Sequence, residues 1–114
     1  MSAAQGTMPV FLLDRVTATG ASKPYQMAGS GLQNVTVTFT SEGTTSGGTI
    51  LIEESDLPSY TGTWSQVYSQ AASGFTGGAK LAVHVAIGAG MWVRTRVSAT
   101  ITGGGTVTTT LTAG

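Results

Sequence analysis

The chain has 114 residues, which is enough for one domain with one core and too few for two domains of ordinary size. Only 9% of the residues are charged and five basic side chains balance five acidic ones, so neither nucleic acid nor an anionic membrane is expected as a partner. The absence of cysteine excludes disulfides and thiolate metal sites.

The N-terminal segment, residues 1–7, is small and polar, which predicts a flexible arm ahead of a single domain over residues 8–114. The apolar run over residues 10–13 is too short for a signal sequence or a membrane span. We therefore expect synthesis in a cytoplasm without export by a recognisable signal.

Alternation of apolar and polar side chains with a period of two predicts the strands. Along residues 8–19 it is interrupted at Asp14 and Arg15, where we expect a bend. Residues 20–31 are predicted to be a connection in which Tyr25 and Met27 could form a short edge strand. Strands are predicted over residues 8–19, 32–40, 49–54, 64–70, 80–87, 91–102 and 107–111.

The segments between these strands are rich in Gly, Ser, Thr and Pro and predict turns and loops. Within the loop over residues 71–78, Phe75 is expected to turn inward. In the strand over residues 64–70, Trp64, Gln66 and Tyr68 share one parity and are predicted to share one face.

The last predicted strands flank the glycine triplet at residues 103–105. Glycine supplies the positive φ angles of a tight reversal, so the pattern predicts a C-terminal β-hairpin. Seven or eight short strands separated by turns favour an all-β fold, an antiparallel β-sandwich or jelly roll.

His84 is the only histidine and lies in mid-strand between two alanines. A general base or a metal ligand would need partners, and the chain offers neither cysteine nor a second histidine, so a structural or interface role is favoured. No cofactor or metal is predicted.

Three acids, Glu53, Glu54 and Asp56, lie within four residues at a strand end. Such a cluster could bind calcium or supply a pair of glycosidase carboxylates, but Glu53 and Glu54 point to opposite faces of a strand. We interpret these side chains as solvated acids.

Arg94 and Arg96 share a strand face with Trp92. A guanidinium there can stack on the indole, pair with an acid of a neighbouring strand, or contact an anion or a carbohydrate. Trp and Arg are enriched at the centres of protein interfaces. The predicted interface residues are Trp92, Arg94, Arg96, Trp64 and Tyr60.

No motif in the sequence indicates an enzyme. No serine stands in a nucleophile elbow, and the glycine triplet precedes a strand and not a helix, as a phosphate loop would require. Thr-rich strands with few charges leave sheet edges open to pairing, so we expect a homo-oligomer, a trimer being favoured, or a docked subunit.

Several segments resemble small β-sandwich structural proteins of tailed bacteriophages. In residues 50–64 an aliphatic strand leads through Glu-Glu-Ser-Asp to Gly-Thr-Trp; residues 92–97 then read Trp-Val-Arg-Thr-Arg-Val, and a Gly-rich turn leads into Thr-Val-Thr at 106–108. The resemblance implies a virion component assembled in the host cytoplasm: first a capsid decoration or cement protein that bridges major capsid protein subunits, second a tail or fibre subunit.

Two other functions remain open at this point. A similar run occurs in carbohydrate-binding sandwiches, so the chain could recognise host sugars through aromatic platforms at Trp64, Trp92, Tyr60 and Tyr68. A hydrolase centred on Glu53, Glu54, Asp56 and His84 ranks last.

Overall fold

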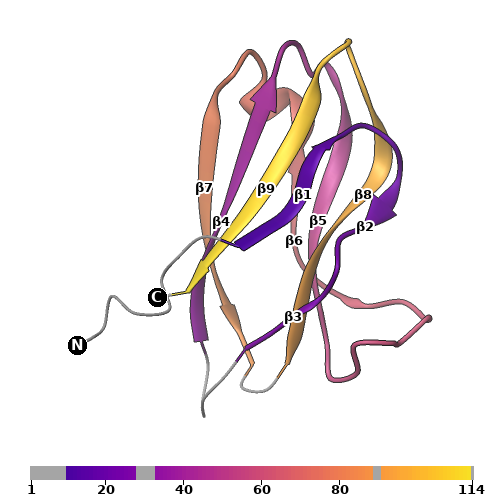
Figure 1. Cartoon of the computed structure of the whole chain (residues 1–114), viewed down its shortest axis with the longest axis vertical. Coiled ribbons are helices and arrows are strands. Elements are labelled where there is room, and N and C mark those ends of the chain that lie inside the picture. Colours follow the sequence, from indigo (N-terminus) through magenta and orange to yellow (C-terminus); the bar gives the residue numbers. More distant parts are fainter. Residues whose placement is uncertain (1–9, 28–32, 89–90, 114) are drawn as a thin grey trace.

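Two antiparallel sheets pack face to face in the computed structural model, which describes residues 10–27, 33–88 and 91–113 (Figure 1). This arrangement is a β-sandwich, and the predicted fold class is confirmed. The predicted N-terminal arm, residues 1–7, lies outside the described residues.

The four-stranded sheet has the order β1-β9-β4-β7. Its strands are β1 (Val10–Val16), β9 (Thr106–Ala113), β4 (Gln33–Glu42) and β7 (Lys80–Ile87). β4 and β7 pair without a register shift from Gln33 opposite Ile87 to Thr40 opposite Lys80. This regular pairing keeps alternate side chains of both strands on one face.

The five-stranded sheet has the order β2-β8-β5-β6, and β3 also pairs with β8. Its strands are β2 (Gly20–Ala21), β3 (Tyr25–Gln26), β5 (Gly47–Ser55), β6 (Ser65–Ala71) and β8 (Trp92–Thr102). The short edge strand predicted near Tyr25 is therefore present. A 3₁₀ helix, η1 (Ala72–Phe75), follows β6 and buries Phe75, as predicted.

The predicted C-terminal hairpin is wrong. β8 and β9 lie where the alternation placed them, but β8 belongs to the five-stranded sheet and β9 to the four-stranded sheet (Figure 1). The glycine triplet carries the chain from one layer of the sandwich to the other. A crossing of this kind needs the same positive φ angles as a hairpin turn, at Gly103 and Gly104, so the local sequence does not distinguish the two.

The bend predicted in the first strand is present. Arg15 has a φ of 50°, and the pairing of β1 with β9 shifts register between Phe11 and Leu13 and again between Leu13 and Val16. These irregularities still leave Leu13 buried.

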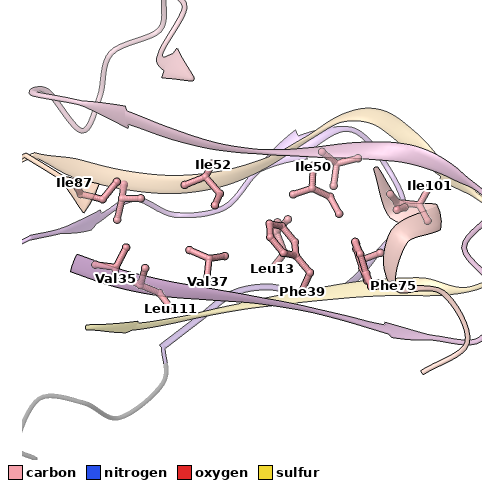
Figure 2. Close-up of a cluster of buried hydrophobic side chains, with 14 of the residues drawn as sticks. Leu13, Val35, Val37, Phe39, Ile50, Ile52, Phe75, Ile87, Ile101 and Leu111 are labelled. Atoms are coloured by element: carbon pink, nitrogen blue, oxygen red, sulfur yellow. The ribbon is translucent and has the colours of Figure 1, made fainter. Parts of the chain in front are cut away.

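The core lies between the two layers (Figure 2). Ile50 and Ile52 of β5 face Val37 and Phe39 of β4, and all four are fully buried. Because the inward side chains alternate along each strand, the outward positions of both sheets remain available for other roles.

A bulge in β6 corrects the predicted parity of that segment. Ile52 pairs with Tyr68 while the next residue, Glu53, pairs with Gln66, so β6 carries one extra residue. Tyr68 lies on the inner side, with its ring centroid 6.5 Å from that of Phe39, whereas Trp64 lies on the outer side of the sheet, against Arg94.

Candidate functional site

The outer face of the five-stranded sheet holds two arginines on one carboxylate. Arg94 and Arg96 project outward from β8 because Val93, Thr95 and Val97 fill the inward positions. Glu53 lies opposite Arg94 on the neighbouring strand β5. The pairing of an arginine with an acid of an adjacent strand is therefore confirmed.

The geometry of this triad is close. Arg94 Nε donates to Glu53 Oε1 at 2.9 Å, and Arg96 contacts Glu53 Oε2 through Nε at 3.1 Å and Nη2 at 3.0 Å. The side chain of Glu53 is only 2% exposed. The interpretation of Glu53 as a solvated acid is therefore wrong. Its burial is tolerated because two guanidinium groups compensate the negative charge.

Trp64 packs against the Arg94 side of the triad. The centre of the Arg94 guanidinium lies 4.1 Å from the centroid of the Trp64 ring, which is within range of a cation–π interaction. Trp64 Nε1 donates to the main-chain oxygen of Tyr60 at 2.9 Å, and Trp64 is 2% exposed. Trp64 consequently has no free ring face on which a sugar could stack, and Tyr68 faces the core.

The predicted interface residues are brought together only in part. Arg94, Arg96 and Trp64 form one cluster. Tyr60, which is 47% exposed, joins this cluster only through its main-chain oxygen, which accepts the hydrogen bond from Trp64 Nε1. Trp92 is half-buried at the start of β8, where it lies opposite Ser55.

A recess opens beside this cluster. It has a volume of about 350 Å³ and is bordered on one side by the loop that carries Trp64 and on the other by the arginines. Its lining residues are Glu53, Thr61, Gly62, Thr63, Trp64, Arg94 and Arg96.

The outer face of the four-stranded sheet is different in character. Threonines in register on β4 and β9 form cross-strand pairs, Thr36 with Thr112, Thr38 with Thr110 and Thr40 with Thr108. Phe11 of β1 lies opposite Thr110 and is 68% exposed. A shallow groove of about 610 Å³ includes Phe11 and four of these threonines.

Phe11 was missed as a candidate by the sequence reasoning. The signal was present, because Phe11 has the parity opposite to the apolar residues Val10 and Leu12, which share one face of that strand. A large apolar side chain on the outward parity of an edge strand is a reason to suspect a contact.

The acids and the histidine do not form a common site. His84 is exposed on the outer face of the four-stranded sheet, with Nδ1 2.8 Å from Thr36 Oγ1, whereas Glu53 is on the outer face of the other sheet. Glu54 instead accepts from the Gly88 N–H at 3.4 Å, and Asp56 is exposed. Among the described residues, no three side chains of His, Asp or Glu are placed to hold a metal ion.

No helix in the described ranges is long and apolar enough to cross a membrane. Comparisons of the sequence with models of known protein families and with curated proteins find no match.

Proposed function

We propose that this chain is a non-enzymatic structural protein of a bacteriophage virion, a capsid decoration protein that docks on neighbouring capsid subunits and stabilises the head. The resemblance of residues 50–64, 92–97 and 106–108 to small phage β-sandwich proteins motivates this proposal. The trimer favoured by the sequence is part of it.

One structural observation supports docking most directly. The outer face of the four-stranded sheet presents rows of threonine hydroxyls and an exposed phenylalanine, and the charged residues that border its groove are Asp14, Arg15, Glu42 and Lys80. A broad face with so few charges has a low desolvation cost when it is covered, and hydroxyl groups can keep hydrogen bonds with a partner or with interfacial water.

Phe11 is the residue that best serves as an anchor on this face. Aromatic side chains contribute disproportionately to interfaces because they bury a large rigid surface. Since Phe11 is 68% exposed, its replacement removes little packing within the monomer and tests docking separately from folding.

The test uses particles of the phage that encodes the chain, grown from a mutant lacking this protein, separated into heads and tails, and mixed with the purified protein. We expect co-sedimentation with heads, and we expect Phe11→Ser to weaken it at least tenfold. Leu57→Ser is the matched control, because Leu57 is a 56% exposed apolar residue in a loop away from this face.

Light scattering after size-exclusion chromatography measures the mass of the free protein, for which a trimer is expected. Co-sedimentation with tails alone would support the tail or fibre alternative and reject the decoration role. Equal binding of heads by the wild-type protein and the Phe11→Ser variant would reject the proposed docking face.

A further inference from the structure

The charges in the recess beside Trp64 do not balance. Arg94 and Arg96 contribute two positive charges, and Glu53 contributes one negative charge to both ion pairs. Among the described residues, neither arginine forms an ion pair with any other acid. The recess therefore holds one uncompensated positive charge.

Partial burial makes this excess charge consequential. The side chains of Arg94 and Arg96 are 18% and 35% exposed, so each is partly shielded from water. In such a position the attraction between a cation and an incoming anion is screened less than on an open surface.

Arg94 has hydrogen-bonding capacity outside its ion pair. A guanidinium carries five N–H donors, and Glu53 accepts from Arg94 only through Nε. The four N–H groups on the two Nη atoms of Arg94 lie outside this ion pair. Arg96, in contrast, uses both Nε and Nη2 on Glu53.

The guanidinium of Arg94 is also held in place before any ligand arrives. Trp64 stacks over it at 4.1 Å, and the hydrogen bond from Trp64 to Tyr60 fixes the indole. A Cβ added at Gly62 would collide with the Tyr60 ring, which shows how closely the loop folds over itself. A donor that is already ordered loses less entropy on binding.

We infer that this recess is a binding site for one monovalent oxyanion, and that the ligand is a carboxylate such as an acidic side chain or a chain terminus of a partner molecule. The Nη N–H groups of Arg94 supply the hydrogen-bond donors, and Arg96 supplies a second positive charge. One negative charge neutralises the site, and the planar fork of a guanidinium matches the two oxygens of a carboxylate. This inference goes beyond the virion role and does not depend on it.

The test is an NMR titration that follows the side-chain Nε–H signals of the arginines and the indole N–H of Trp64. The probe is sodium acetate, with sodium chloride at equal ionic strength as the reference and sodium dimethyl phosphate as a second monovalent oxyanion. We expect saturating shifts at Arg94 and Trp64 with acetate at a dissociation constant of about 1–10 mM, the range of a single weak contact.

Arg94→Lys keeps the charge and removes the fork, and we expect it to weaken acetate binding at least tenfold. Arg15→Lys is the matched control, because Arg15 is an exposed arginine in β1 of the other sheet, and its acetate titration should match that of the wild-type protein. The chemical shifts of the core methyl groups report whether each variant keeps the fold. If Arg94→Lys does not fold, the comparison of acetate with chloride on the wild-type protein still tests the inference.

Shifts with acetate that do not exceed those with chloride would overturn the inference, as would equal acetate binding by Arg94→Lys in its folded form. Tighter binding of dimethyl phosphate than of acetate would reject the carboxylate and assign the site to a phosphodiester.

Discussion

Glu53 shows how one residue can determine the chemistry of a whole sheet face. It lies on an outward position of β5, where a side chain would ordinarily reach water, but two arginines of β8 bind it and the indole of Trp64 packs against Arg94. A carboxylate in this position stabilises the fold only through its two partners, and its negative charge offsets the repulsion between them.

At the residue scale we therefore expect Glu53→Gln to lower the free energy of unfolding by about 2–3 kcal/mol, since removing one partner of a buried pair leaves the other charge uncompensated. This loss is smaller than is usual for breaking a fully buried ion pair, because the Arg96 side chain is 35% exposed and its charge is partly screened by water. Urea denaturation at low salt measures it.

Glu42→Gln is the control for this substitution. Glu42 is exposed, and we expect its replacement to change the free energy of unfolding by no more than about 0.5 kcal/mol. Added salt should partly restore the stability of Glu53→Gln by screening the two guanidinium groups from each other. Equal losses in the two variants would show that the triad does not contribute as the geometry indicates.

At the element scale, the two turns at one end of the sandwich explain why β8 and β9 do not pair. Residues 43–46 connect β4 to β5, residues 103–105 connect β8 to β9, and each turn crosses from one sheet to the other (Figure 1). The turns contact each other directly, with Gly105 N donating to Thr44 O at 2.7 Å and Ser46 N donating to Thr102 O at 2.8 Å.

This contact predicts that Gly103 and Gly104 differ in how well they tolerate substitution by alanine. A Cβ at Gly103 would come within 2.8 Å of Ser46 N and 2.9 Å of Thr44 O, whereas nothing lies within 4 Å of a Cβ at Gly104. Both residues have positive φ. We expect Gly104→Ala to cost about 1–2 kcal/mol from backbone strain alone and Gly103→Ala to cost about 2 kcal/mol more.

Thermal and urea denaturation of the two alanine variants measure this difference. In a simple hairpin turn, with no second turn packed on the first, the collision at Gly103 would be absent. Similar costs at the two positions would thus contradict the packing of the turns.

A buried hydrogen bond between β8 and β9 also joins the two layers. Thr95 Oγ1 and Thr109 Oγ1 are 2.8 Å apart and both residues are fully buried, and Thr109 Oγ1 also accepts from the Leu13 N–H at 3.0 Å. The hydroxyl of Thr109 therefore serves two partners, and that of Thr95 serves one.

We expect Thr109→Val to lower the free energy of unfolding by about 2 kcal/mol, because it leaves the buried Leu13 N–H and the Thr95 hydroxyl without a partner. Thr95→Val should cost less, about 1 kcal/mol, because Leu13 keeps its acceptor. Urea denaturation of the pair of variants gives the order, and a larger loss for Thr95→Val would contradict this network.

At the scale of the whole molecule, the sheets are built almost entirely from pairs that are distant in the chain. β1 pairs with β9, β5 with β8, and β4 with both β7 and β9. The N-terminal strand therefore cannot complete its pairing until the last strand has been placed.

Such a topology predicts slow folding, because the entropy of closing long loops must be lost before distant contacts form. We expect refolding in milliseconds to seconds, the range of β-sandwiches of this size. Stopped-flow fluorescence reports it, since Trp64 becomes buried on folding. Refolding in microseconds would contradict the dominance of non-local pairing.

The amino-acid sequence by itself determined the positions of the main strands and the inward faces of those without a bulge, whereas the parity of β6 was wrong. Alternation identified Val35, Val37 and Phe39 as buried, and likewise Val107 and Leu111, because a strand between core and surface requires this period regardless of its neighbours. The sequence also indicated the bend at Arg15 and the inward turn of Phe75.

Only the tertiary structure decided which strands pair. Hydrogen-bond partners in a sheet are set by contacts across the whole chain, so the glycine triplet is equally compatible with a hairpin and with a crossing between layers. The same reason applies to the candidate site: Glu53 and Arg96 are 43 residues apart, and the burial of Glu53 depends on the pairing of β5 with β8 and on the bulge that turns Trp64 outward.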